Sequence, residues 1–199
     1  VMNKFFTQQK NVVKSSFSGK RALVTAGPTV EVIDPVRYVS NRSSGKMGYA
    51  IAEALRDKGA IVTLISGPTH LSLPEGINVV KVESADDMFQ AVTERFAKQD
   101  IVIKAAAVSD YTPMDILEHK LKKQEGGLSV QFKRTKDILK YLGENKTHQY
   151  LVGFAAETQN IEQYALDKLK RKNADVIISN NVGDTSIGFS SDDNELTMH

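Results

Sequence analysis

The stretch Asn41-Arg42-Ser43-Ser44-Gly45-Lys46-Met47-Gly48 separates an apolar run from a helical pattern. The run over residues 22–26 predicts a buried strand, apolar side chains recur at helical spacing over residues 49–59, and residues 61–65 predict the next strand. A helix that begins after a strand directs its free N–H groups toward the strand ends, where phosphate commonly binds. The candidate phosphate loop comprises Ser43, Ser44, Gly45, Lys46, Met47 and Gly48.

The glycine spacing in this stretch departs from both common phosphate-binding motifs. A P-loop has a glycine five residues before its Gly-Lys-Ser/Thr, but Ser40 stands there and Met47 follows the lysine. A dinucleotide motif needs tightly spaced glycines, whereas Gly27, Gly45 and Gly48 are spread over a long loop. An equally good interpretation is that Gly45 and Gly48 only let the helix begin close to the sheet.

Composition narrows the classes of protein to consider. A chain of 199 residues suits one domain, or one domain with a small lobe. The absence of cysteine excludes disulfides, thiolate metal sites and a cysteine nucleophile, and the four histidines lack metal-ligand spacing. No apolar run approaches the roughly 18 to 20 residues of a membrane span, and we see no secretory signal. We therefore expect a cytoplasmic protein that contacts no membrane, and the net charge of +2 does not favour a nucleic-acid partner.

Apolar strand patterns alternate with helical patterns along the chain. Further strands are predicted at 79–82, 100–104, 150–155 and 176–179, and helices at 85–97, 135–142 and 160–172, with Ser84 as the cap of the first of these. The pattern predicts an α/β fold, a Rossmann-like doubly wound and mostly parallel sheet with ligands beyond the carboxyl ends of its strands. Residues 110–136 interrupt the alternation and include a short alternating strand at 128–132, so we expect an inserted flap there.

The two ends of the chain differ from the rest. Residues 1–18 are mostly polar and are interpreted as a linker or N-terminal extension, which leaves 19–199 as the nucleotide-binding domain. Residues 195–198 resemble the start of a strand with no helix after it. We therefore expect that the C-terminal end of the domain is truncated.

The segment that follows the strand at 100–104 combines small side chains with a carboxylate. Ala105, Ala106 and Ala107 would let a ligand approach the backbone closely, and Asp110 could meet a metal or a base edge. Tight packing of a helix on the sheet would explain the alanines equally well, but it would not explain Asp110.

Cationic side chains fall into three groups near loops or element ends. One such group is usually a solvated surface, but three on the expected ligand side favour a polyphosphate, because nucleotide transfer reactions need Lys, Arg and Mg²⁺ to neutralise charge. The groups are Lys120, Lys122 and Lys123; Lys133, Arg134 and Lys136; and Lys168, Lys170, Arg171 and Lys172.

A charged loop precedes the phosphate-loop candidate. Glu31, Asp34 and Arg37 crowd a segment stiffened by Pro28 and Pro35, which suits recognition of a polar substrate. A loop held by salt bridges alone is the other interpretation.

Two further functions remain as alternatives. Tyr164 and Lys168 match the Tyr-x-x-x-Lys pair of short-chain dehydrogenases, which would make the chain an NAD(P)-dependent oxidoreductase. The glycine spacing is wrong for that class, and Leu151 and Val152 occupy the region where its strand-end serine should stand. The third possibility is a non-catalytic nucleotide-binding module whose lysines only hold phosphate.

From about Gly19 to its end, the chain resembles the phosphopantothenoylcysteine synthetase (phosphopantothenate–cysteine ligase) family, which forms the second half of bifunctional bacterial coenzyme A biosynthesis proteins. No single motif is specific for this family, but the number of matching motifs and their order along the chain are. The matching segments are Gly27-Pro28-Thr29 with Glu31, Ile33-Asp34-Pro35-Val36-Arg37, Asn41 to Gly48, Ala106-Ala107-Val108-Ser109-Asp110-Tyr111, Lys120-Leu121-Lys122-Lys123, Gly153-Phe154-Ala155-Ala156-Glu157-Thr158, Arg171-Lys172-Asn173 with Asp175, and Gly188-Phe189 with Asp192.

The resemblance implies a ligase that activates 4′-phosphopantothenate with CTP and Mg²⁺ as an acyl-cytidylate and then couples it to L-cysteine. By position, Lys120 would help to form the acyl-nucleotide, while Asn41, Arg37 and Ala107 would hold it for attack. The resemblance assigns no protein ligand to Mg²⁺ and does not decide between CTP and ATP. The implied CTP contacts are Lys104, Ala105, Ala106, Asp110, Lys120, Lys133, Arg134, Thr135, Lys136, Phe154, Lys168 and Lys172.

The same resemblance implies an assembly. Members of the family dimerise through the C-terminal part of the domain, so a homodimer is expected, and a flavin-dependent decarboxylase half can be fused in the full protein. This chain carries no flavin site of that kind. One departure concerns Thr135-Lys136-Asp137, which stands where the family often has a proline before the aspartate and leaves the role of this loop in doubt.

Overall fold

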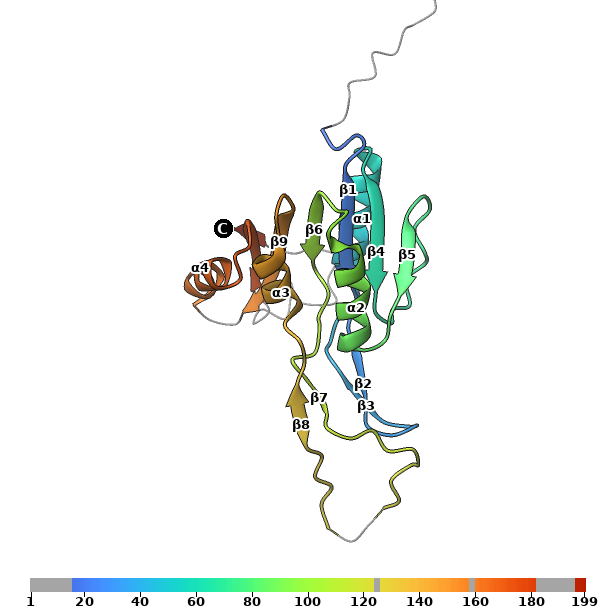
Figure 1. The fold of residues 1–199 in the computed structure, drawn as a ribbon. Coiled ribbons are helices and arrows are strands. Elements are labelled where there is room, and N and C mark those ends of the chain that lie inside the picture. The colour runs from blue at the N-terminus through green and yellow to red at the C-terminus, as the bar shows by residue number, and fades with distance from the viewer. Residues whose placement is uncertain (1–15, 124–125, 158–159, 182–195) are drawn as a thin grey trace, which may run out of the picture.

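The computed structural model describes residues 16–123, 126–157, 160–181 and 196–199. Its centre is a seven-stranded sheet in the order β11-β10-β9-β6-β1-β4-β5, in which only β11 runs antiparallel to its neighbour (Figure 1). The predicted parallel α/β sheet is therefore confirmed. The strands are β1 (Arg21–Ala26), β4 (Ile61–Ser66), β5 (Asn78–Lys81), β6 (Ile101–Lys104), β9 (Tyr150–Glu157), β10 (Val176–Asn181) and β11 (Leu196–Met198).

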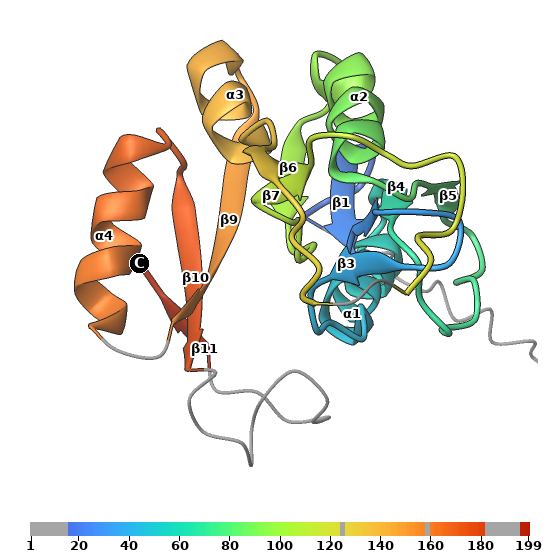
Figure 2. The ribbon, with the colours of Figure 1, turned by 90° about the horizontal axis from the view of Figure 1, so that it is seen from below.

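Helices cover both faces of the sheet, as the doubly wound class requires. In Figure 2, α2 and α3 lie on one side of the sheet and α1 on the other. Two separate apolar clusters fill these layers: one joins α2, α3 and α4 to the sheet, and the other joins α1 to the opposite face of β1 and β4. The described helices are α1 (Lys46–Asp57), α2 (Ala85–Phe96), α3 (Ile138–Asn145) and α4 (Ile161–Arg171).

The helix caps explain why one predicted helix start is correct and another is not. The Ser84 hydroxyl accepts from the backbone of Asp87, and the Asp87 carboxylate accepts in return from the backbone of Ser84, so the predicted cap is a complete capping box. Helix α3 begins at Ile138, three residues after the predicted start at 135, because the Asp137 side chain caps it by accepting from the backbone N–H of Lys140.

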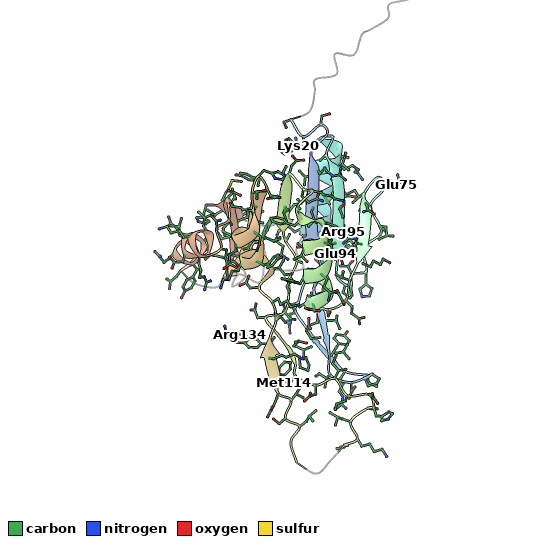
Figure 3. All side chains as sticks on the ribbon, in the orientation of Figure 1. Lys20, Glu75, Glu94, Arg95, Met114 and Arg134 are labelled. Atoms are coloured by element: carbon green, nitrogen blue, oxygen red, sulfur yellow. The ribbon has the colours of Figure 1, made fainter. Side chains whose placement is uncertain are left out.

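An arm extends from the carboxyl ends of the parallel strands. It consists of the antiparallel pair β2 (Val30–Val32) and β3 (Tyr38–Ser40), and of the flap, in which β7 (Tyr111–Pro113) pairs with β8 (Phe132–Arg134). Figure 3 labels Met114 and Arg134 on this arm, at the end of the molecule opposite Lys20. The strand predicted at 128–132 is wrong except for its last residue, and the β2–β3 hairpin was not predicted at all.

Residues 1–15, most of the predicted N-terminal extension, lie outside the described residues, while Phe17 packs against the cluster beneath α1. The predicted final strand is present as β11, at the edge of the sheet. None of the described helices has the length and apolar character that crossing a membrane would need.

Gly143 allows the last turn of α3 to approach the end of α4. A Cβ added at this position would lie 1.8 Å from the carbonyl oxygen of Lys172, far inside van der Waals contact. The side chain of Asn173 reinforces the contact by donating to the carbonyl of Gly143 at 2.8 Å. The position of α4, and with it the lysines near its C-terminus, therefore depends on a glycine in α3.

We predict that Gly143→Ala destabilises the fold by about 1 to 3 kcal/mol, because the methyl group must push α3 away from α4. Helix propensity alone would make the same change stabilising by up to about 1 kcal/mol, so the sign distinguishes the two effects. Urea unfolding monitored by circular dichroism measures the change.

Gly127→Ala is the matched control, since a Cβ at Gly127 meets no atom within 4 Å. Equal stabilities for Gly143→Ala and Gly127→Ala would contradict the close approach of α3 and α4.

Candidate functional site

Two loops that follow the neighbouring strands β1 and β6 are joined by backbone hydrogen bonds. The N–H of Ala107 donates to the carbonyl of Gly27 at 2.9 Å, and the N–H of Thr29 donates to the carbonyl of Ala107 at 3.3 Å. The Asn41 side chain also donates to the Ala107 carbonyl, at 3.2 Å. Two of the predicted catalytic residues, Asn41 and Ala107, are therefore in contact although they lie 66 residues apart.

Arg37 joins the β2–β3 hairpin to the flap. Its guanidinium donates to the buried Asp34 carboxylate through both Nε and Nη2, at 3.0 and 2.5 Å, and Nη2 also donates to the carbonyl of Leu121 at 2.9 Å. The Leu121 N–H donates in turn to Asp34 at 3.2 Å. The Arg37 side chain and the surrounding backbone N–H groups hold the pKa of Asp34 far below its usual range. The salt bridge in this loop is therefore present, and it also fixes the chain next to Lys120. Substrate recognition by the loop stays a prediction.

Lys120 lies in a cleft that this junction creates, which we call the flap cleft. The cleft has a volume of about 520 Å³, and the described residues that line it carry four cationic side chains and no acidic one. It can accept an anionic group such as a carboxylate or a phosphate. Its lining residues are Arg37, Lys120, Leu121, Lys122, Lys123, Gly126, Gly127 and Leu128.

A second cleft of about 520 Å³, here called the lysine cleft, opens at the carboxyl ends of β6 and β9. Of the predicted nucleotide contacts, Lys133 and Ala105 are not among its lining residues, and Lys120 lines the flap cleft instead. The predicted contacts that do line it are Lys104, Ala106, Asp110, Arg134, Thr135, Lys136, Phe154, Lys168 and Lys172. Cationic side chains from three distant segments, the end of β6, residues 134–136 and α4, thus meet at one place.

Helix α4 and the start of α3 supply the charged wall of this cleft. Lys168 donates to the carbonyl of Phe154 at 2.8 Å, and Lys172 forms an ion pair with Asp137, the residue that caps α3. Burial alone would raise the pKa of Asp137, but the hydrogen bonds from Lys172 and from the backbone of Lys140 lower it, so the carboxylate stays charged. Asp137 was not among the predicted site residues, although its position before a helical pattern marks it as a cap.

Lys104 forms part of the floor of the lysine cleft. It is the last residue of β6 and is 8% exposed, with its ammonium nitrogen 3.4 Å from the Thr25 hydroxyl. Burial lowers the pKa of Lys104 to about 7, against a smaller opposing effect of the Asp137 charge.

The loop over residues 135–137, whose role the sequence left in doubt, belongs to the lysine cleft. Thr135 anchors it through its N–H to the Asp110 carbonyl, at 2.9 Å, and through its hydroxyl to the Ser109 carbonyl, at 2.7 Å. Lys136 pairs with Asp86 at 2.8 Å and lies 4.8 Å from the centre of the Phe89 ring. The loop therefore occupies a defined position without the proline.

The candidate phosphate loop lies elsewhere. None of the residues 43–48 lines the lysine cleft, and α1 begins within the loop, at Lys46. A Cβ at Gly48 would lie 2.5 Å from the Cβ of Ala26, which supports the alternative that glycine lets α1 pack closely on β1. Phosphate binding by this loop stays a prediction.

The Tyr164–Lys168 pair does not have the surroundings that an oxidoreductase would need. Tyr164 is 42% exposed and shares a surface cleft on α4 with Lys168, but it is not among the residues that line the lysine cleft. The lysine is also engaged with the Phe154 carbonyl. The position of Tyr164 outside the lysine cleft therefore disfavours the alternative based on this pair.

Comparison with known proteins agrees with the geometry. Residues 17–199 match the model of the family "DNA/pantothenate metabolism flavoprotein C-terminal domain". The chain is 54% identical over 181 residues to the coenzyme A biosynthesis bifunctional protein CoaBC of Bacillus subtilis, covering 90% of this chain and 45% of the relative. It is 46% identical over 198 residues to CoaBC of Haemophilus influenzae, covering 99% and 48%.

A solved structure, the C-terminal domain of a CoaBC protein, superposes with a TM-score of 0.79 at 48% identity, covering 93% of this chain and 83% of that one. The chain thus spans a little less than half the length of the full-length curated relatives and most of a solved C-terminal domain. These similarities and the arrangement of the sheet lead to one conclusion. The chain belongs to the family of DNA/pantothenate metabolism flavoprotein C-terminal domains.

Proposed function

We propose that this domain is a phosphopantothenate–cysteine ligase of coenzyme A biosynthesis. It would activate 4′-phosphopantothenate with CTP as an acyl-cytidylate and couple it to L-cysteine, giving 4′-phosphopantothenoylcysteine, CMP and pyrophosphate. The observation that carries the proposal is the adjacency of two features at the end of β6. Ala106 lines the lysine cleft, and Ala107, the next residue, accepts from Asn41. A nucleotide and an acyl group can therefore meet there.

In the first step, the substrate carboxylate attacks the α-phosphate of CTP, and pyrophosphate leaves as the bond to the β-phosphate breaks. Both partners are anions, so cationic groups must screen their repulsion. We assign this screening to Lys168 and Lys172 on the nucleotide and to Lys120 on the forming acyl-nucleotide. Because Lys120 lines the flap cleft, the acyl substrate would extend from that cleft toward the end of β6.

In the second step, the amine of cysteine attacks the acyl carbon, CMP leaves with the anhydride oxygen, and the amine loses a proton. The Asn41 amide and the Ala107 backbone would orient the bound anhydride, which makes the attack effectively unimolecular. Arg37 is engaged by Asp34 and Leu121, so its proposed contribution is to hold the hairpin and the flap in register around the intermediate.

We propose that Mg²⁺ enters with the nucleotide, as is usual for triphosphates. Among the described residues, no group of three or more His, Asp or Glu side chains is placed to hold a metal ion. The carboxylates of Asp110 and Asp137 line the lysine cleft and could contact the ion or its waters, while the lysines there suit the phosphates. The residues present therefore fit a nucleotide that carries its own cation.

The assembly is also a proposal. Because the CoaBC relatives are about twice as long as this chain, we propose that the domain functions fused to a flavin-dependent decarboxylase half. The cytoplasmic location stays a prediction. We further propose a homodimer, because large apolar side chains are exposed on the arm. The family resemblance placed the dimer contacts in the C-terminal part of the domain, which falls partly on residues outside the described ones. The exposed apolar residues of the arm are Val36, Tyr38, Val39, Tyr111, Met114, Ile116, Leu117, Leu128 and Phe132.

We expect Lys168→Met and Lys172→Met each to weaken CTP binding by about 10- to 100-fold, the loss typical of a charge-assisted hydrogen bond to phosphate. Isothermal titration calorimetry with CTP and Mg²⁺ measures the change. Lys170→Met, on the same helix but outside the lysine cleft, is the matched control and should bind as the wild type does. Equal weakening in all three variants would show that α4 contributes only a general positive field.

The two reaction steps should separate in two variants. Lys120→Gln should slow pyrophosphate release by about 100-fold or more, because Lys120 acts on formation of the acyl-nucleotide. Asn41→Asp should still release pyrophosphate but stall amide formation, so that acyl-cytidylate accumulates. A coupled pyrophosphate assay and mass spectrometry of the quenched mixture follow the two steps.

Failure of Lys120→Gln and Asn41→Asp at the same step would refute these roles. Lys98→Gln, on an exposed residue beyond the end of α2, controls for loss of a lysine. If the wild-type protein binds CTP but releases no pyrophosphate with both other substrates present, the domain is the non-catalytic binding module. Binding of NADPH in place of CTP would instead favour the oxidoreductase.

The dimer proposal predicts that Ile116→Lys, which places a charge at a position that is 66% exposed, shifts the protein toward the monomer. Sedimentation equilibrium measures the oligomeric state, with Ile61→Lys as a control, because Ile61 is 59% exposed at the opposite end of the sheet. A wild-type protein that is monomeric at all concentrations would exclude the dimer.

A further inference from the structure

Lys104 occupies an unusual position for a lysine. It ends a central strand of the sheet, and its ammonium group lies beneath the lysine cleft, among β1, β6 and α2. The partners of its nitrogen are the Thr25 hydroxyl at 3.4 Å and the Met88 sulfur at 4.0 Å. Neither partner is charged, and the Thr25 hydroxyl already accepts from the N–H of Ala106 at 3.1 Å. The site therefore offers little that would stabilise an ammonium ion in place of water.

Among the described residues, the charged groups that act on Lys104 belong to the wall of the cleft. Asp137 at the start of α3 favours the protonated form, and Lys168 on α4 opposes it. The effect of Asp137 is limited because its carboxylate is shared with Lys172 and with the cap of α3. From β1 and α2, the contacting groups of Thr25 and Met88 are uncharged. The protonation of Lys104 is thus decided by burial and by groups that a nucleotide would itself engage.

We propose that Lys104 takes up a proton when a nucleoside triphosphate occupies the lysine cleft, so that nucleotide binding is coupled to pH. The inference rests on the proposed function. Phosphates placed beside Lys168 and Lys172 would offset the positive charge of Lys168 and add negative charge above a poorly hydrated amine. Both changes favour the ammonium form. Lys104 is in this view a positioning residue, whose charge appears only when the nucleotide is bound.

The direction of the pH dependence follows from the free protein. Burial lowers the pKa of Lys104 to about 7, so in the empty cleft the amine is largely neutral above that pH. A bound triphosphate raises the pKa, so proton uptake is greatest between the pKa values of the empty and the filled cleft. The affinity for CTP should then fall as the pH rises from 7 to 9, by at most about tenfold per unit from this group.

Isothermal titration of CTP with Mg²⁺ in buffers of different ionisation enthalpy counts the protons exchanged on binding. At pH 8, the wild-type protein should take up more protons per CTP than Lys104→Met, by up to about one proton. The γ-phosphate titrates too, but it contributes equally to all variants, so the difference isolates Lys104. Lys98→Met is the matched control and should exchange the same number of protons as the wild type.

Thermal unfolding of the same proteins without nucleotide gives a second measurement that also tests whether the variant folds. The pKa of Lys104 is about 7 in the folded protein, against the ordinary lysine value of 10.5 that we expect in the unfolded chain. Between these values the unfolded chain binds more protons, so the burial of the ammonium destabilises the fold most below pH 7. Lys104→Met should therefore melt at a higher temperature than the wild type at pH 6, and its advantage should shrink toward pH 9.5. Lys104→Gln replaces it if the methionine variant does not fold.

Each outcome decides the proposal. If the wild type and Lys104→Met bind CTP with the same proton count, the coupling does not exist, although the ligase could still be correct. A melting-temperature difference that does not change with pH would likewise show that Lys104 does not titrate in this range. If the wild type does not bind CTP at all, the proposed function fails and the coupling fails with it.

Discussion

The backbone junction between the loops after β1 and β6 is the constraint on which both clefts depend. Ala107 both donates to Gly27 and accepts from Thr29, so two adjacent parallel strands stay joined beyond the end of the sheet. The junction continues outward, because the Ser109 N–H donates to the Thr29 hydroxyl at 3.0 Å and the Ser109 carbonyl accepts from Thr135. Together with the bridge from Arg37 and Asp34 to Leu121, this junction fixes the flap and the β2–β3 hairpin relative to the strand ends. The side chains that face the clefts therefore share one frame.

Several cationic side chains of the lysine cleft are each paired with an acceptor. Lys172 is paired with Asp137, Lys136 with Asp86, and Lys168 donates to the Phe154 carbonyl. Each of these acceptors carries less negative charge than a phosphate group or also binds another group. A polyanion can therefore compete with them for the cations. Such prior orientation also reduces the rotamer entropy that a long side chain would lose on binding. The wall of the cleft is therefore ordered before any ligand arrives.

Periodicity predicted the central sheet and the helices, because long buried segments carry a strong pattern. It missed the β2–β3 hairpin, whose strands have three residues each and are held by Arg37 and Asp34 rather than by alternation. Charge placement predicted that lysines would gather at the carboxyl ends of the strands. It could not show that Lys120 lines one cleft and Lys168 another, because the positions of lysines in the sequence do not determine where the loops that carry them fold.

The described cationic side chains near the carboxyl ends of the strands divide between two clefts. The described residues that line the flap cleft are cationic or uncharged, whereas the lysine cleft combines its cations with the carboxylates of Asp110 and Asp137. Cations and carboxylates together suit a metal-bound triphosphate, because the cations can meet the phosphates and the carboxylates can meet the metal ion. The Arg37 bridge from Asp34 to Leu121 lies between hairpin and flap and belongs to the first cleft. Under the proposed function, the carboxylates of the lysine cleft would favour a metal-bound nucleotide there, and the segment around Ala107 would join the two bound groups.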